Sequence, residues 1–193
     1  MKYITWALGE FVHGIKTAFR ALMWLFRHPA CCGVALILSL LIIAVGSVQK
    51  SLGTLLLFAS LPLLTPSLDQ IALRVECDVL KLPIPKWTFL YSFPTLIERF
   101  KLFIVLIIFS ICLLPVFIQF QMGWAEVMIK FFCIGTFYFD YPYFRRGYDL
   151  NKRIGKTLRR PWALMGLGLF SLFPPITIIG GVLLALEDPE LSS

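Results

Sequence analysis

Long stretches without charge alternate with short basic segments along this sequence, and no other feature constrains the fold as strongly. Ala30 to Val48, Leu102 to Phe120 and Trp162 to Leu186 contain no charged residue. About 20 apolar residues are enough to span the roughly 30 Å of hydrocarbon in a bilayer. Charged residues make up only 15% of the chain, against about a quarter in soluble domains. The sequence therefore predicts an all-α integral membrane protein rather than a soluble enzyme.

The order of these stretches predicts one membrane domain over 1–193, with an interfacial helix, two transmembrane helices and two proline-broken hairpins. The expected segments are an interfacial helix (1–29), a membrane hairpin (30–66), a cytosolic helix and loop (67–101), a helical hairpin (102–139), a basic cytosolic loop and helix (140–161), a re-entrant hairpin (162–186) and a tail (187–193). The second half of the membrane hairpin, 52–66, is short and predicts a thin or partial crossing.

Proline positions predict where the two later hairpins break, because proline removes a helical hydrogen bond. Pro115 interrupts the first hairpin, and the pair Pro174–Pro175 interrupts the second. Two full crossings remain an alternative for 102–139, and one kinked span with the tail outside remains an alternative for 162–186. Ser67 with Gln70 fits a capping box that opens the cytosolic helix, and Asp149 stands at the start of a short basic helix over 149–160.

Residues 3–28 predict an amphipathic helix with one apolar, aromatic-rich face. The apolar positions recur at steps of three and four: Ile4, Leu8, Phe11, Ile15, Phe19, Leu22 and Phe26. Basic residues interrupt the remaining positions, and such a helix tends to lie in the membrane interface. The alternative is a soluble helix packed on a protein core. Pro29 ends the helix, and the following apolar run is expected to act as an uncleaved signal anchor.

The basic residues fix an expected orientation. Segments 1–29, 67–101 and 140–161 hold 4, 5 and 7 of the 18 Lys and Arg residues, which leaves only Lys50 and Lys130. Basic segments stay on the cytosolic side of membranes, so both termini are expected in the cytosol. The net charge of +7 then predicts contact with anionic lipid headgroups and not with nucleic acid.

Several short motifs, in order, resemble the superfamily of CysZ sulfate permeases and etoposide-induced proteins. They are Phe11–Val12–His13–Gly14, Arg27–His28–Pro29, Pro66–Ser67–Leu68–Asp69 with Glu76, Asp140–Tyr141–Pro142, Arg145–Arg146–Gly147, Gly166 with Gly168, and Pro174 with Gly180–Gly181. The resemblance implies two long membrane helices, two half-penetrating hairpins, cytosolic termini and a dimer. It also implies passage of sulfate or a similar oxyanion across a bacterial inner membrane.

One position in the resemblance keeps a second function open. The sulfate-handling relatives carry basic residues after the proline that precedes the first membrane helix, whereas this chain has Ala30–Cys31–Cys32–Gly33 after Pro29. A membrane scaffold or partner-binding protein that transports nothing is therefore the alternative to a permease. His13 and His28 form no catalytic constellation with other residues in the sequence, so no enzyme activity is expected.

Two groups of residues are candidates for binding an anion. The helix start at Cys31, Cys32 and Gly33 would offer free amides to an oxyanion, and Arg145 with Arg146 would offer positive charge. The alternatives are a ligand-free helix start and a lipid-anchoring basic loop.

One ion pair and the cysteines complete the expectations. Glu126 and Lys130 lie one helical turn apart in an apolar hairpin, either as a functional intramembrane pair or as mutually neutralising groups near the interface.

The five cysteines predict small buried side chains, with no metal site, disulfide framework or cofactor.

Overall fold

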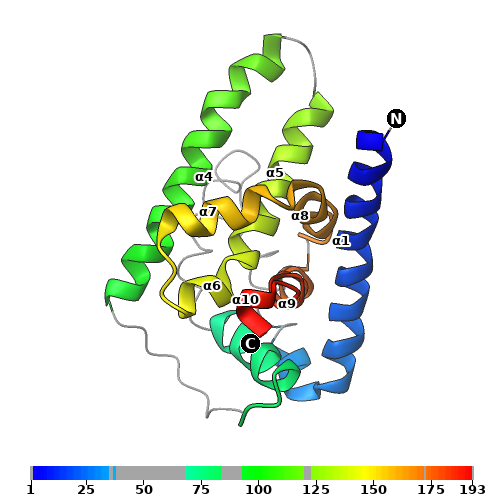
Figure 1. Cartoon of the computed structure of the whole chain (residues 1–193), viewed down its shortest axis with the longest axis vertical. Helices are drawn as coiled ribbons and strands as arrows, with labels where there is room; N and C mark the ends of the chain where they lie inside the picture. Colours follow the sequence, from blue (N-terminus) through cyan, green and yellow to red (C-terminus); the bar gives the residue numbers. More distant parts are fainter. Residues whose placement is uncertain are drawn as a thin grey trace.

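The computed structural model describes residues 2–34, 37, 68–83, 93–119, 123–171 and 173–192. Helices are the only regular secondary structure in these ranges, which confirms the all-α class (Figure 1). Within them, no helix is both long enough and apolar enough to cross a membrane. The predicted transmembrane segment 52–66 and most of 30–48 fall outside these ranges, as does Pro66.

Helix α1 (Lys2–Arg27) confirms the amphipathic helix and shows which face packs on the protein. Its buried positions are mostly small, with Gly14, Ala18 and Ala21 among them. The large apolar face points outward, because Ile4, Leu8, Phe19 and Phe26 are exposed. Helix α1 therefore packs on the core of α8 and α9 through its small residues, as the alternative prediction has it, and its position in a membrane interface stays a prediction.

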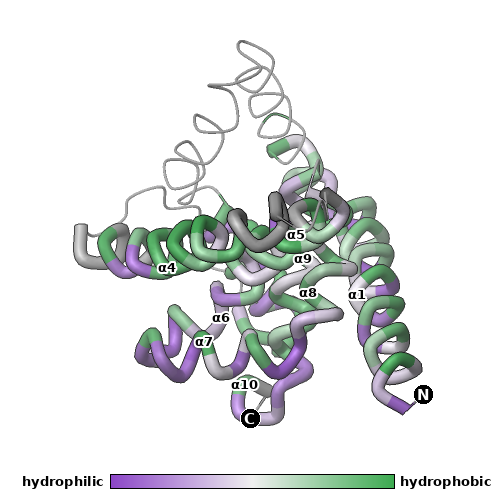
Figure 2. The backbone as a smooth tube through the Cα atoms, turned by 90° about the horizontal axis from the view of Figure 1, so that it is seen from above, coloured by the Kyte–Doolittle hydropathy of each residue, from purple (hydrophilic) through white to green (hydrophobic). Residues whose placement is uncertain are grey.

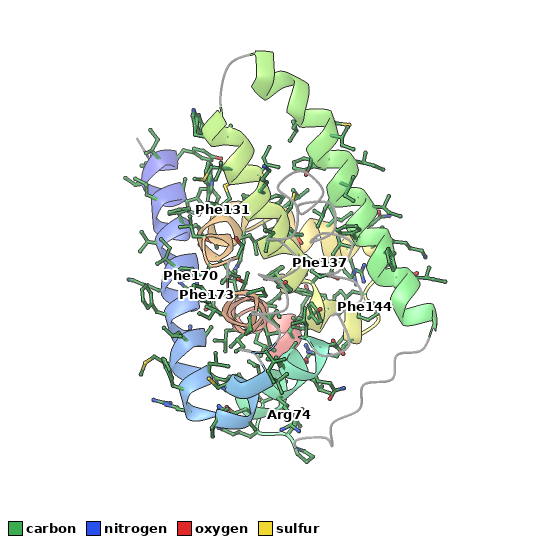
Figure 3. The ribbon with its side chains drawn as sticks, turned by 180° about the vertical axis from the view of Figure 1, so that it is seen from behind. Arg74, Phe131, Phe137, Phe144, Phe170 and Phe173 are labelled. Atoms are coloured by element: carbon green, nitrogen blue, oxygen red, sulfur yellow. The ribbon has the colours of Figure 1, made fainter. Side chains whose placement is uncertain are left out.

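The double proline separates two short helices, α8 (Pro161–Gly168) and α9 (Pro174–Ala185). Pro174 and Pro175 occupy the first turn of α9, where the missing amide hydrogens have no helical partner to lose. The hairpin lies between α1 and α5 (Gly123–Phe139) (Figure 1). All twelve residues of α9 are buried. In the turn between the helices, Phe170 meets Phe19 edge-on at 5.8 Å (Figure 3).

Glycines let α8 contact α1 and α5 backbone to backbone. A Cβ at Gly166 would lie 2.2 Å from the carbonyl oxygen of Phe11, and one at Gly14 would lie 2.0 Å from that of Ala163. On the opposite side of α8, Gly168 meets Phe131 of α5 in the same way, at 2.1 Å. Small residues at helix crossings are typical of helices packed within membranes.

The first hairpin consists of α4 (Phe93–Gln119) and α5, but Pro115 does not break it. Helix α4 continues through Pro115, so the prediction of a proline break here is wrong. A proline removes one hydrogen bond, and a helix can absorb that loss with a bend. Helix α4 also begins at Phe93, inside the segment expected to be a cytosolic loop.

Short helices fill the side of the molecule where polar residues gather. They are the helical stretch 68–79, α6 (Tyr141–Arg145), α7 (Leu150–Leu158) and α10 (Pro189–Ser192). Asp149 caps α7 by accepting a 3.0 Å hydrogen bond from the Lys152 amide, as predicted. The predicted cap residue Ser67 lies outside the described residues. Hydrophilic residues surround α6, α7 and α10, while α4 and α5 are mostly hydrophobic (Figure 2).

Candidate functional site

The charged layer is the set of ionisable side chains that α6, α7, the helical stretch 68–79 and residues 187–190 bring together, with His13 and Arg20 of α1. Its members from the other elements are Asp69, Glu76, Asp140, Arg145, Arg146, Arg153, Lys156, Arg160, Glu187, Asp188 and Glu190. Residues from both ends of the sequence meet in this layer. It is the largest concentration of charge in the part of the chain that the structure describes, and hence the candidate functional site.

Arg145 and Arg146 project from the last turn of α6 toward the helical stretch 68–79. The Arg145 guanidinium donates to Asp69 Oδ1 at 3.0 Å and to Glu76 Oε2 at 2.5 Å. Arg146 Nη2 lies 3.3 Å from Glu76 Oε1 and donates to the Leu191 carbonyl at 2.6 Å. Both predicted anion-binding arginines are therefore engaged with carboxylates of the chain itself.

The turn after α6 explains how these two arginines are placed. Gly147 has a φ of +72°, a left-handed conformation that costs glycine little. The amides of Gly147 and Tyr148 donate to the carbonyls of Phe144 and Tyr143 and close the end of α6. Among the predicted motif residues, Arg145–Arg146–Gly147 thus forms one structural unit, in which the glycine ends the helix that carries the arginines.

Asp140 and Arg153 form the most deeply enclosed ion pair described. Arg153 Nε lies 3.2 Å from Asp140 Oδ1, and each side chain is 1% exposed. The Arg153 guanidinium also lies over the Phe144 ring, 5.4 Å from its centre (Figure 3). Pro142, two residues after Asp140, is buried in the first turn of α6. Removing charges from water is unfavourable, so each partner depends on the other.

The acidic segment, residues 187–191, inserts its carboxylates among basic side chains of α1 and α7. Glu187 Oε2 lies 2.7 Å from Arg160 Nη1 and 2.9 Å from His13 Nε2. Arg20 of α1 lies 3.4 Å from the other oxygen of Glu187. The segment predicted as a tail is therefore docked on the protein through its charges.

Lys156 is the second anchor of the acidic segment. Its ammonium donates to Asp188 at 2.7 Å and to Glu190 at 2.6 Å. Two tyrosine hydroxyls complete the contacts, since Tyr143 donates to Asp188 and Tyr148 donates to Glu190. Although α7 is a basic amphipathic helix as predicted, Lys156 is nearly buried beneath this segment rather than presented to solvent.

These contacts shift the protonation of the groups involved. Burial disfavours the charged form of Glu187, but hydrogen bonds from Arg160 and His13 outweigh it and hold the pKa of Glu187 below its usual value. Burial of Asp188 is likewise outweighed by Lys156 and Tyr143, so the pKa of Asp188 is lowered. The pKa of Lys156 is raised, because its two carboxylate partners outweigh its desolvation. All three groups therefore stay charged near neutral pH.

The helix start after Pro29, which is predicted as an anion site, does not belong to the acidic segment or its partners. Residues 29–34 are helical, and the Cys32 amide bonds back to the His28 carbonyl at 3.0 Å. Cys31 is buried and Gly33 is exposed, and a Cβ at Gly33 would meet no atom of the described residues within 4 Å. Arg74, from the helical stretch 68–79, lies close enough for its charge to act on the Cys31 thiol (Figure 3). A distant element thus supplies a positive charge that the local sequence lacks.

The predicted Glu126–Lys130 pair is only half visible. Lys130 is exposed on α5 and borders a largely apolar cavity of about 220 Å³ between α4 and α5, beside Ser110 and Cys133. The side chain of Glu126 lies outside the side chains described, so the pair stays a prediction.

In the described residues, the candidate site contains neither a disulfide nor a cluster of metal ligands. All five cysteines are free thiols. In the described ranges, no three His, Cys, Asp or Glu side chains come together in a way that could hold a metal ion.

Sequence reasoning missed most of the partners in the charged layer. The sequence predicts the basic residues of this layer, but it predicts Glu187, Asp188 and Glu190 only as part of a tail. The negative charge of these three residues, opposite to that of the basic block 145–160, is the one signal in the sequence that could have predicted their pairing.

The chain matches no protein-family model, no curated protein and no solved structure, so the resemblance to CysZ-like proteins stays a prediction.

Proposed function

We propose that this chain is an integral membrane protein, similar to CysZ permeases, that lets sulfate or a related oxyanion cross the bilayer. The observation that carries the membrane part is the apolar outer surface of α1 and α4. Phe26 is 69% exposed and Ile111 is 61% exposed, and both belong to rows of exposed large apolar side chains. Apolar patches of this kind are rare on soluble monomers and suit contact with lipid.

The packing of the C-terminal hairpin supports the same proposal. Helices α8 and α9 have 8 and 12 residues, which gives lengths of about 12 and 18 Å. Neither reaches the roughly 30 Å of hydrocarbon, as a re-entrant hairpin requires. In this proposal, segment 30–48 crosses the bilayer, segment 52–66 makes a thin or partial crossing, and the charged layer lies on the cytosolic side of a bacterial inner membrane.

For the oxyanion, Arg74 provides the best support. Its positive charge acts at Cys31, near the helix start where the oxyanion is proposed to bind, although the Cys32 amide there already bonds to the His28 carbonyl. The proposed pathway passes this helix start, within a protein that forms a dimer.

Flux of labelled sulfate into liposomes containing the purified full chain tests this proposal. We expect uptake above that of empty vesicles, and we expect Arg74→Gln to reduce it about tenfold or more. Lys152→Gln is the matched control, because it removes one exposed charge on α7, away from Arg74, and should leave uptake unchanged. Uptake equal to that of empty vesicles for sulfate, phosphate and other oxyanions would refute the permease.

A scaffold that transports nothing is the second candidate, and the pairing of Arg145 and Arg146 with Asp69 and Glu76 favours it. Arginines already neutralised by the chain are poor ligands for a passing anion. A stable partner recovered with the chain from detergent-solubilised membranes, together with absent flux, would support this reading. Measurable flux without any such partner would exclude it.

A further inference from the structure

The acidic segment lies in a basin of positive charge built by three helices. His13 and Arg20 come from α1, and Lys156 and Arg160 come from α7 and the residues after it. Tyr143 of α6 adds a hydroxyl donor. Each of these groups points at a carboxylate of Glu187, Asp188 or Glu190, so the segment is bound in the manner of an anionic ligand.

The basin holds more positive charge than the segment neutralises. A cavity of about 200 Å³ lies against the segment, bordered by Lys156, Arg159 and Arg160 together with Glu187 and Asp188. Arg159 makes no ion pair with any described residue and is exposed. Lys156, by contrast, is nearly buried and serves two carboxylates at once. Loss of the segment would remove both carboxylate partners of Lys156 and leave its ammonium open to another anion.

We propose that residues 187–191 act as an intramolecular anion, and that the basin beneath them binds a tetrahedral oxyanion when the segment leaves. The carboxylate oxygens lie 2.6 to 2.7 Å from Lys156 and Arg160, and the oxygens of sulfate or phosphate accept the same donors at the same distances. Free sulfate, free phosphate and the phosphate of a lipid headgroup share this chemistry.

For the permease this inference adds a form of regulation, and in that respect it rests on the proposed function. The acidic segment would compete with the oxyanion for one site on the cytosolic side. A high concentration of anion would displace the segment, and a low concentration would let it dock again. The difference in affinity between the docked segment and the free anion sets how far the anion shifts the segment from its docked to its released state.

The test is to neutralise the segment while keeping its shape, with the triple variant Glu187→Gln, Asp188→Asn and Glu190→Gln. Titration calorimetry of the full chain in neutral detergent, with sulfate and with phosphate at constant ionic strength, measures binding. We expect the triple variant to bind at least tenfold more tightly than the parent chain. Adding Arg160→Gln to the triple variant should abolish the gain.

A pair of single variants separates this site from a general effect of net charge. Glu187→Gln and Glu98→Gln each remove one negative charge, and Glu98 pairs with Lys101 on α4. Only Glu187→Gln should tighten anion binding. Equal gains in both variants, or a correctly folded triple variant that binds no tighter than the parent, would overturn the proposal. A chain that ends at Leu186 repeats the test without the acidic segment, after circular dichroism has shown that it is folded.

Two further arms identify the source of the anion. The first arm compares vesicles of phosphatidylglycerol with vesicles of phosphatidylcholine. A lipid headgroup is the anion if only the phosphatidylglycerol vesicles bind the triple variant more tightly than they bind the parent chain. Tighter binding of inorganic sulfate or phosphate in detergent identifies a free anion, and either result supports the basin. Binding is measured without transport, so a failed flux experiment with gained binding removes the permease and keeps the basin.

Discussion

Two regions of this molecule hold helices together by different chemistry. The crossing of α1, α5, α8 and α9 uses backbone contacts at Gly14, Gly166 and Gly168, with no charge inside α8 or α9. The charged layer joins α6, α7 and the acidic segment through ion pairs that fix which side chain meets which. Close steric fit suits helices surrounded by lipid, whereas ion pairs suit the wetter side of the molecule. The change in packing chemistry therefore marks the expected boundary between the two environments.

The largest effect is expected at the buried pair of the charged layer. Asp140→Ala leaves the Arg153 guanidinium enclosed without its carboxylate, and we expect the free energy of unfolding to fall by about 3–5 kcal/mol. Denaturant unfolding of the detergent-solubilised protein, followed by circular dichroism, measures this loss. Replacing both partners, as Asp140→Leu with Arg153→Met, should restore most of the stability. A single variant as stable as the parent would show that the pair contributes nothing.

The glycine crossing is expected to respond next. In Gly168→Ala, the new methyl group would lie 2.1 Å from the Phe131 carbonyl oxygen, and two further backbone atoms of Phe131 lie within 3 Å of it. Overpacking of this kind costs about 1–3 kcal/mol. The same unfolding assay applies, and a loss below about 0.5 kcal/mol would mean that α8 and α5 separate more easily than the close contact indicates.

Lowering the pH should release the acidic segment while leaving the glycine crossing intact. The pKa values of Glu187 and Asp188 lie below their usual values of 4.5 and 3.8. Docking is therefore fully stabilised above those usual values and is lost as the pH falls through the lowered ones. Each unit by which a pKa is lowered corresponds to about a tenfold change in docking.

Amide hydrogen exchange of residues 186–191, corrected for its intrinsic pH dependence, measures that release. Exchange should accelerate only at acid pH in the parent chain, while the amides of α9 stay protected. The triple variant of the acidic segment should exchange rapidly at neutral pH as well. A parent chain whose exchange does not change between pH 7 and acid conditions would contradict docking through charge.

The smallest expected change in stability comes from a glycine of α1 that makes no close helix contact. Gly9 is also in α1, but no atom of the described residues lies within 4 Å of a Cβ placed there. Gly9→Ala should therefore stabilise the protein by about 0.5–1 kcal/mol, because alanine favours the helix. Thermal unfolding beside Gly14→Ala gives the comparison. Destabilisation by Gly9→Ala would show that α1 makes a contact outside the described residues.

Local features of the fold could be predicted because a local rule fixes each of them. Pro174–Pro175 begin a new helix, since proline is tolerated in a first turn but not in a helix interior. Asp149 caps α7 through its own side chain. Pro115 misled the same rule, because a single proline bends a long helix without ending it.

The partners in the charged layer could not be predicted, because nothing local chooses them. Arg145 meets Asp69 and Glu76 across about 70 positions of sequence, and His13 meets Glu187 across the length of the chain. Charge alone allows any of these basic residues to pair with any carboxylate. The role of each glycine depends on which helix lies opposite to it in the fold. The charge of Arg74 acts on Cys31 for the same reason, because the fold brings their two elements near each other.

The small-residue face of α1 has a consequence for biosynthesis. Its partners, α8 and α9, lie more than a hundred positions further along the chain, so the ribosome makes α1 long before anything can cover it. Throughout that interval Gly14, Ala18 and Ala21 remain open to other helices. A neighbouring nascent chain, a chaperone or an insertase could shield this surface until translation delivers the hairpin. The contacts that bury this face therefore form only after the C-terminal third has been synthesised.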